Sequence, residues 1–248
     1  MKKIIILYTL LLCPVLLFAQ NLIEQANQAY TENRYEEAIS LYEEVISKSG
    51  KSPIIYYNLG NSYYRLNKIA PAILNYERAL LLDPANEDIR FNLEIAKLKT
   101  VDKIESVDKF FLVGWYDGIQ DSFSTNQWSY IAIFSFITLI VCLFLFFFTR
   151  RAGFKKIGFF LGSIMLVVCI FANIFAHRQE KELSDKNTAI IFSATTTIKS
   201  SPAASGTDSF ILHEGTKVSI TDKVGEWSEI QTADGYKGWI LSEEIEII

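Results

Sequence analysis

Side chains that could carry out chemistry are few in this sequence of 248 residues. Two of the three cysteines, Cys142 and Cys169, lie inside long apolar runs, and Cys13 lies in an apolar N-terminal segment. The histidines, His177 and His213, have no Cys, His, Asp or Glu neighbour at metal-ligand spacing, so we expect two lone, exposed imidazoles. The sequence also lacks a Ser/His/Asp set and a phosphate-binding glycine loop. It therefore predicts a protein that is not an enzyme and that holds no metal or other cofactor.

The composition favours contact with lipid over contact with nucleic acid. Half of the residues are hydrophobic, only 21% are charged, and the formal net charge is -4. The C-terminal stretch 186–248 contains five Lys or Arg residues against nine Asp or Glu residues. Nucleic acid is therefore not an expected partner, whereas the apolar excess suggests that part of the chain lies in a membrane.

The first 19 residues have the three-part pattern of a secretory signal peptide. Lys2 and Lys3 are followed by an apolar core over 4–18 and by Ala19, a suitable residue for cleavage before Gln20. An uncleaved N-terminal anchor is the alternative, because Leu17 is larger than the residue usually found two places before the cut.

Two further apolar runs are long enough to cross a hydrocarbon core of roughly 30 Å, and they predict transmembrane helices over 128–149 and 157–176. The loop between them, 150–156, carries four positive charges and no negative ones, which is typical of the cytoplasmic side. We therefore expect a two-span protein of the cytoplasmic (inner) membrane with periplasmic N- and C-terminal domains. The runs contain no Asp, Glu, Lys, Arg or His, so they suit an anchor better than a transport pathway.

Residues 20–100 repeat themselves at an interval of 34 residues, as in the pairs Tyr30 and Tyr64, Ala38 and Ala72, and Tyr42 and Tyr76. The period, the residue types and their order resemble tetratricopeptide repeats. In that family the place of Gly60 is a close approach between two helices, and Ala26 takes this place in the first repeat. The resemblance implies two repeats, 20–52 and 53–84, and a capping helix over 86–100.

The family pattern places five residues on the inner surface of the stack as a candidate partner-binding groove: Asn27, Tyr30, Asn61, Tyr64 and Arg65. Asn27 and Asn61 are one repeat apart, and paired amides suit the N–H and C=O groups of an extended peptide. The alternative is that these residues only pack and cap the stack. Ile23 and Tyr57 replace the lysine of carboxylate-clamping relatives, so we expect a neutral or apolar peptide segment.

Residues 101–127 form an amphipathic pre-membrane segment. Aromatic and aliphatic residues such as Phe110, Phe111 and Trp115 recur near helical spacing and are interleaved with Asp117 and Asp121. The segment is too polar to span a bilayer. Location along the membrane surface and contact with a partner are equal alternatives.

Helical patterns stop after a charged linker over 177–187, and residues 188–248 show short strand patterns separated by turns. Three motifs resemble a bacterial SH3 domain: Glu214-Gly215-Thr216, Gly225-Glu226-Trp227 and Asp234-Gly235-Tyr236-Lys237-Gly238-Trp239. We expect Trp227 and Trp239 to fill the core of this small barrel. The alternative is an aromatic ligand surface made of Tyr236, Trp227 and Trp239, since some relatives bind cell-wall peptides.

The order of these segments resembles the BatE family of the aerotolerance (Bat) operons of Bacteroidetes-type bacteria. That resemblance implies protein partners, namely Bat proteins with von Willebrand A domains and other repeat proteins, associated with a MoxR-type ATPase. The predicted fold class is a multidomain membrane protein with an all-α repeat solenoid, a two-helix transmembrane hairpin and a small all-β SH3-like barrel. The predicted function is a scaffold that recruits partners; the alternative is a sensor that binds peptidoglycan peptides.

Overall fold

The structure, a computed structural model, describes residues 22–104 and 110–248. The predicted signal peptide, 1–19, and the question of its cleavage lie outside these residues. The repeat helices and the C-terminal strands form one compact unit, and residues 109–185 form a second together with the segment 81–85.

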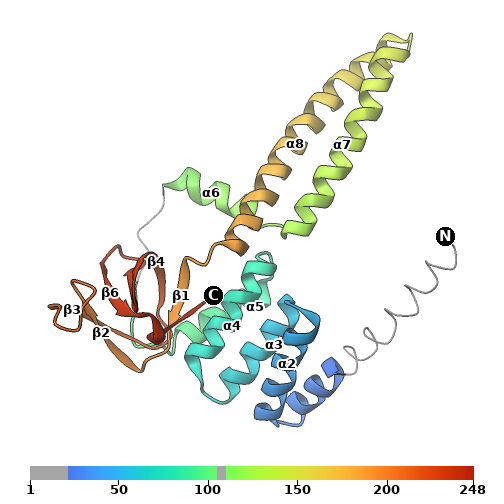
Figure 1. Cartoon of the computed structure of the whole chain (residues 1–248). Helices are drawn as coiled ribbons and strands as arrows, with labels where there is room; N and C mark the ends of the chain where they lie inside the picture. The colour runs from blue at the N-terminus through green and yellow to red at the C-terminus, as the bar shows by residue number, and fades with distance from the viewer. Residues whose placement is uncertain (1–21, 105–109) are drawn as a thin grey trace, which may run out of the picture. The chain divides into compact units, whose positions relative to one another are not determined.

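Five helices form the repeat region of the first unit (Figure 1). They are a helix over residues 22–31, α2 (Tyr35–Ser49), α3 (Pro53–Arg65), α4 (Ile69–Leu82) and α5 (Glu87–Lys97). The turn inside each repeat contains an asparagine with positive φ, Asn33 at 63° and Asn67 at 58°. Asparagine tolerates this left-handed conformation better than most residues. The predicted helical repeats are therefore confirmed, and the turn geometry recurs at their period.

Small residues let the repeat helices approach each other closely. A Cβ atom added to Gly60 would lie 2.7 Å from the ring of Tyr76 on the next helix. Ala26, which takes the same place in the first repeat, is fully buried. Tyr42 and Tyr76 are each 1% exposed, so large rings fill the space beside small residues.

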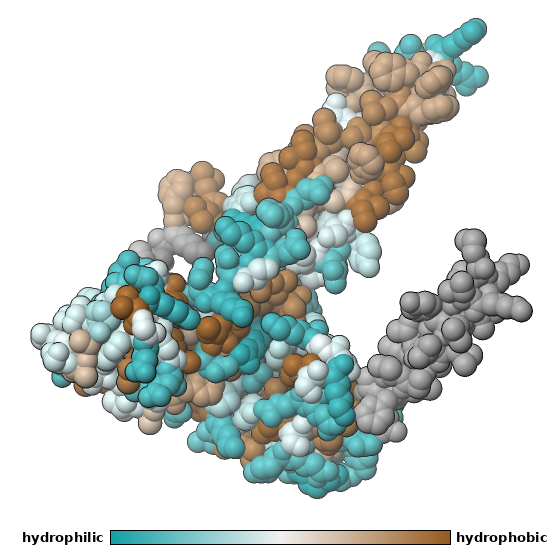
Figure 2. Space-filling view, in the orientation of Figure 1, coloured by the Kyte–Doolittle hydropathy of each residue, from teal (hydrophilic) through white to brown (hydrophobic). Residues whose placement is uncertain are grey.

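The second unit contains α6 (Phe111–Gln120), α7 (Thr125–Phe148) and α8 (Ala152–Ser184). Within the described residues, α7 and α8 are long and apolar enough to cross a membrane, and most of their apolar side chains are uncovered (Figure 2). They pack side by side where Gly158 and Gly162 of α8 lie close to Cys142 of α7. Small residues at such a contact are typical of helix pairs in lipid.

Both helices extend beyond the predicted spans of 128–149 and 157–176. The non-helical connection is 149–151, so only 150–151 of the predicted loop 150–156 are non-helical, and α8 continues through most of the predicted linker 177–187. The reason is that Arg, Lys, Glu and Gln are good helix formers. Arg178 and Glu182 also form an i,i+4 ion pair with 3.4 Å between Nε and Oε1.

The C-terminal barrel is an antiparallel sheet with the strand order β3-β2-β6-β5-β4-β1-β7. The strands are β1 (Thr188–Ile191), β2 (Thr195–Lys199), β3 (Asp208–His213), β4 (Lys217–Val224), β5 (Trp227–Gln231), β6 (Lys237–Leu241) and β7 (Ile245–Ile247), with a 3-10 turn at Ser242–Glu244 before β7. Gly215, Gly225 and Gly235 lie at turns with positive φ, which glycine adopts without a steric penalty.

The barrel core is aliphatic, and the prediction that Trp227 and Trp239 fill it is wrong. Ile198, Ile230 and Ile240 are 0–1% exposed, whereas both tryptophans are only half-buried. Successive side chains of a strand point to opposite faces. Ser228 and Ile230 of β5 are buried and Ile240 of β6 is buried, so the tryptophans belong to the other face.

Candidate functional site

Asn27 and Asn61 of the predicted groove make the same contacts one repeat apart. Oδ1 of Asn27 accepts a hydrogen bond of 2.7 Å from the hydroxyl of Tyr42, and Oδ1 of Asn61 accepts one of 2.7 Å from Tyr76. Each oxygen also accepts a bond from the next repeat, at 3.3 Å from Nδ2 of Asn58 and at 3.0 Å from Nδ2 of Asn92. The result is a ladder of amides that links successive repeats.

The oxygen and the nitrogen of each groove amide have different surroundings. The side-chain oxygens of Asn27 and Asn61 serve the fold, as the packing alternative expects. The side-chain nitrogens donate to no residue that the structure describes, and Asn27 is exposed while Asn61 is half-buried. Each nitrogen can donate to a peptide carbonyl, so peptide binding stays a prediction with a defined donor.

Burial reinforces the protonated state that the tyrosines of the ladder already have at neutral pH. Burial raises the pKa of Tyr42 to about 12. Burial also raises the pKa of Tyr76, well above its ordinary value. Both hydroxyls therefore remain donors at neutral pH and hold the amide oxygens.

The other three predicted groove residues pair with side chains that the sequence did not single out. The rings of Tyr30 and Tyr35 meet edge to face at 5.4 Å, and the guanidinium of Arg65 lies 5.7 Å from the ring centroid of Tyr35. Nζ of Lys99 lies 4.2 Å from the ring centroid of Tyr64. Arg65 and Lys99 are exposed, so cations stand over aromatic faces among the groove residues.

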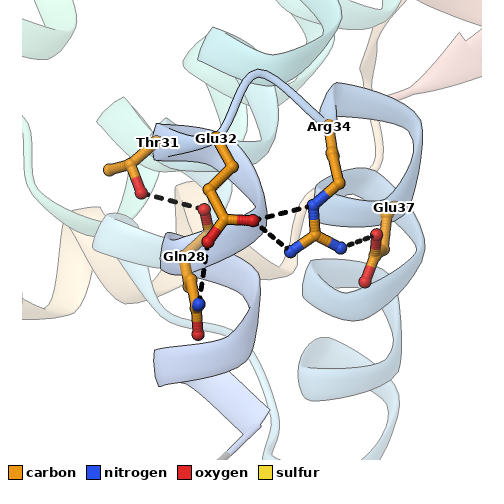
Figure 3. A network of polar contacts seen from close by, with 5 residues as sticks. All are labelled: Gln28, Thr31, Glu32, Arg34 and Glu37. Carbon is orange, nitrogen blue, oxygen red and sulfur yellow. Dashed lines mark hydrogen bonds and ion pairs between the residues drawn. The ribbon is translucent and has the colours of Figure 1, made fainter.

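A network of exposed charges in the first repeat links the two sides of the turn between the helix 22–31 and α2. Figure 3 shows Arg34 between Glu32, at 2.7 Å from Nη2 to Oε2, and Glu37 of α2. Gln28 donates to Glu32 at 2.8 Å. This hydrogen bond and those of Arg34 hold the pKa of Glu32 below its ordinary value. The charges pair with one another across the turn after the helix 22–31, so this cluster is structural.

The repeat region and the barrel meet at a buried glutamate. Glu77 of α4 is 7% exposed, and Lys217 of β4 donates to its Oε2 at 2.7 Å. Lys97 of α5 lies 3.3 Å from its Oε1. Burial raises the pKa of Glu77, but the two lysines outweigh burial and hold that pKa below its ordinary value. Glu77 is therefore charged and is neutralised by one cation from each module.

A second carboxylate joins the two modules after α5. Asp102 accepts hydrogen bonds of 2.7 Å from the backbone N–H of His213 and from the hydroxyl of Thr216, and its Oδ1 lies 2.8 Å from Nδ1 of His213. We call the contacts around Glu77 and Asp102 the repeat–barrel joint. The expectation of a lone, exposed His213 is wrong, because its side chain is half-buried and paired. Close backbone approach adds to the joint, since a Cβ on Gly215 would lie 2.7 Å from Thr100.

Acidification is expected to weaken the repeat–barrel joint. Burial raises the pKa of Asp102, but hydrogen bonds from His213 and Thr216 leave that pKa below its ordinary value of 3.8. The pKa of Glu77 is below its ordinary value of 4.5. A carboxylate with a depressed folded-state pKa contributes stability that is present above the unfolded pKa and lost as the pH falls through the folded pKa. The contribution of both groups should therefore hold near neutral pH and fall below about pH 4.

The measurement is the urea midpoint of the detergent-solubilised chain between pH 7 and pH 3. A Glu77→Gln variant should show a shallower decline on acidification, because its side chain does not titrate. An identical decline in the variant and the parent protein would remove Glu77 from the acid response.

The three residues of the predicted aromatic surface, Tyr236, Trp227 and Trp239, lie apart on the barrel. Tyr236 is 66% exposed, contacts Phe210 at 6.1 Å between ring centroids, and lines a hollow of about 340 Å³. Trp227 lines another hollow of about 450 Å³ with Thr195. Trp239 pairs with Glu229 in the register of β5 and β6 and lines neither hollow. The structure therefore does not gather Tyr236, Trp227 and Trp239 into one site.

Among the described residues, no group of three or more His, Cys, Asp or Glu side chains could hold a metal ion. The functional features that the sequence did not reveal are Tyr35, Lys99 and the repeat–barrel joint. Asn58 and Asn92 were visible in the sequence, since both stand one residue before a leucine, Leu59 or Leu93, at the 34-residue interval.

Comparison with known protein families identifies both modules of the first unit. Residues 194–246 match the bacterial SH3 domain, residues 26–67 match a TPR repeat, and residues 53–86 match a tetratricopeptide repeat. Tetratricopeptide repeats and a bacterial SH3 domain are therefore present in this chain. Both are modules of protein–protein interaction.

Individual proteins also resemble part of this chain. Sperm-associated antigen 1 of Rattus norvegicus is 33% identical over 78 residues, which is 32% of this chain and 9% of that protein. The chain thus spans less than a tenth of the length of this relative. The solved structure of the Sgt2 TPR domain from Aspergillus fumigatus has 22% identity and a TM-score of 0.31, and the match covers 42% of this chain and 60% of that one.

Proposed function

We propose that this chain is a non-enzymatic, membrane-anchored scaffold that recruits periplasmic and membrane partners through its repeat groove and its barrel. The two modules indicate protein–protein interaction. The amide nitrogens of Asn27 and Asn61 support the capture of an extended peptide, because each can donate to a backbone carbonyl. The apolar helices α7 and α8 support the anchor.

The repeat–barrel joint is the observation that carries this proposal. Glu77 and Asp102 precede the two apolar helices in the sequence, whereas Lys217 and His213 follow them. Side chains in contact must lie on the same side of a membrane. A chain that crosses the membrane between them must therefore cross it an even number of times, and α7 and α8 supply two crossings.

Charge supports the side on which the two modules lie. The connection between the spans and the start of α8 contain Arg150, Arg151, Lys155 and Lys156 and no acidic residue. Short basic connections stay in the cytoplasm. Both modules then belong in the periplasm, a location that fits a bacterial SH3 domain.

The order of the modules supports a proposal for the physiological assembly. The resemblance to BatE supports a place in a Bat-type aerotolerance or stress complex. Its protein partners would be von Willebrand A-domain Bat proteins and other repeat proteins. The groove favours a neutral or apolar segment of such a partner, because it lacks the lysine of the carboxylate-clamping repeats.

Reporter fusions test this topology. A reporter enzyme that works only outside the cytoplasm should be active when fused after Ile248 and inactive when fused after Arg151. A reporter that works only in the cytosol should give the reverse pattern, which controls for expression. Cytosolic activity of the Ile248 fusion would rule out the anchored scaffold as drawn, because the joint would then carry both modules inward.

A second candidate function is a cell-wall sensor, and the hollow beside Tyr236 and Phe210 favours it. Exposed aromatic rings beside a hollow offer stacking and apolar contact to a short peptide. Retention of the solubilised full chain on purified wall fragments distinguishes this function. Absence of retention would remove the sensor and leave the scaffold intact.

A further inference from the structure

Helix α6 has large apolar side chains that are exposed, whereas a helix at a water-facing surface would bury such side chains. Phe111 is 71% exposed, Trp115 is 70% exposed, and Leu112 is 52% exposed. The only charged side chain of α6 is Asp117, and its only amide side chain is that of Gln120. A helix of this composition needs an apolar environment on most of its surface.

Hydrogen bonds attach α6 firmly to one end of the helix pair α7–α8. The backbone carbonyl of Gln120 accepts from Nε1 of Trp128 at 2.8 Å and from Nε2 of Gln179 at 2.9 Å. The same Gln179 nitrogen donates to the carbonyl of Phe123 at 2.9 Å. The C-terminal end of α6 and the turn that follows are thus bonded to both long helices.

Aromatic packing and one ion pair complete this attachment. The ring of Phe175 lies 5.2 Å from that of Tyr116 and 4.8 Å from that of Trp128, measured between centroids. Arg178 lies 3.3 Å from Oδ1 of Asp117 and 5.1 Å from the ring centroid of Tyr116. The one charge of α6 is therefore neutralised at the helix pair, and the apolar side chains are left on the outside.

The direction of α6 indicates that lipid covers its exposed apolar side chains. Figure 1 shows α6 running crosswise to α7 and α8 at the end of the pair where α7 begins. At this end of α7, Tyr130 is 71% exposed, and tyrosine prefers the membrane–water boundary. A helix that lies across the axis of a spanning pair lies along the membrane plane, and Figure 2 shows a hydrophobic cluster at α6 in addition to the hydrophobic surface of α7 and α8.

We propose that α6 is an interfacial anchor that lies in the outer leaflet, with Phe111, Leu112 and Trp115 in the boundary between headgroups and acyl chains. This inference rests on the proposed membrane anchoring of α7 and α8. Interfacial helices insert their apolar face about 5–10 Å below the headgroups. Residues 110–127 contain no Lys or Arg, so insertion depends on apolar area and not on anionic lipid.

Depth-dependent fluorescence quenching tests this placement in the full chain. A cysteine-free parent, in which Cys13, Cys142 and Cys169 are alanine, receives one cysteine labelled with an environment-sensitive fluorophore. The three sites are Leu112→Cys on α6, Ile137→Cys in the middle of α7 and Lys223→Cys on an exposed position of the barrel. Each protein is reconstituted into vesicles of phosphatidylcholine alone or mixed with phosphatidylglycerol. The lipids carry spin labels high or low on the acyl chain.

The expected result is that the label at 112 is quenched more by the shallow spin label, and equally in both lipid mixtures. The label at 137 should be quenched more by the deep spin label, and the label at 223 by neither. Phe111→Cys should repeat the result for 112, which controls for disturbance by one substitution.

Several outcomes would overturn the proposal. Quenching at 137 without quenching at 112 would leave the hairpin inserted and α6 in water. Quenching at 112 only with phosphatidylglycerol would replace apolar insertion by charge attraction. A blue-shifted label at 112 that no lipid quenches and that depends on protein concentration would indicate a second copy as the cover. Absence of quenching at 137 would reject membrane anchoring itself.

Discussion

Replacing Lys217 with alanine is expected to lower the free energy of unfolding of the repeat–barrel unit by about 2–3 kcal/mol. The substitution leaves the buried carboxylate of Glu77 with Lys97 alone, 3.3 Å away. Removing one partner of a fully buried ion pair costs about 3–5 kcal/mol. The loss here is smaller because Lys97 remains and because the Lys217 side chain is 42% exposed, so water screens part of the attraction.

Urea unfolding of the solubilised chain measures this loss when it is followed by tryptophan fluorescence in a parent with Trp115 and Trp128 replaced by phenylalanine, so that the signal comes from Trp227 and Trp239. Adding Glu77→Gln to Lys217→Ala should recover part of it, because the buried group is then neutral. Lys223→Ala, at an exposed position of the same strand, is the matched control and should change stability by less than about 0.5 kcal/mol. Additive effects of Glu77→Gln and Lys217→Ala would mean that the two side chains do not act as a pair.

Replacing Asn27 and Asn61 with aspartate is expected to weaken partner capture at least about tenfold, which corresponds to about 1.4 kcal/mol. Aspartate keeps an oxygen that can accept from Tyr42 or Tyr76, so the ladder retains its acceptors. It removes the nitrogen that would donate to a peptide carbonyl and places a negative charge there. Alanine is less informative, because it would leave each buried tyrosine hydroxyl without an acceptor, at a cost of about 1–3 kcal/mol.

Photo-cross-linking in native membranes measures partner capture. A photoreactive residue at Tyr64, within the groove, should give adducts in the parent chain and far fewer in the double aspartate variant. Ser40→Asp adds the same charge at an exposed position of α2 outside the groove and should leave the adducts unchanged. Equal adduct yields from parent and variant, with both chains folded, would exclude the amide nitrogens as peptide donors.

The parts of this fold that the sequence predicts are those with local periodicity. The 34-residue interval predicts that small and large residues of neighbouring helices pack together, as Gly60 of α3 and Tyr76 of α4 do. Unbroken apolar runs predict α7 and α8. Turn glycines such as Gly215 mark the barrel. The exact ends of α8 were less predictable, because charged helix formers extend a helix as readily as they form a loop.

The wrong prediction for the two tryptophans and the unpredicted repeat–barrel joint have different causes. The alternation of side chains along β5 places Trp227 on the face of Glu229 and not on the face of Ile230. The large size of the ring favours the core, but strand alternation decides its position. The pairing of Glu77 with Lys217 spans 140 residues of sequence. No spacing rule connects a helix residue to a strand residue across two intervening spans, so a single sequence carries no sign of it.

That separation has a consequence for how the chain matures. Glu77 leaves the ribosome about 7–28 s before Lys217, at about 5–20 residues per second. In the proposed topology, the α-helical module is exported during that interval, and its Glu77 carboxylate still lacks the cation that the barrel provides. In that topology, assembly of the two modules is complete only after the hairpin has entered the bilayer and the last strands have followed it. A nascent chain stalled at the translocon would then stay incompletely stabilised and exposed to envelope proteases.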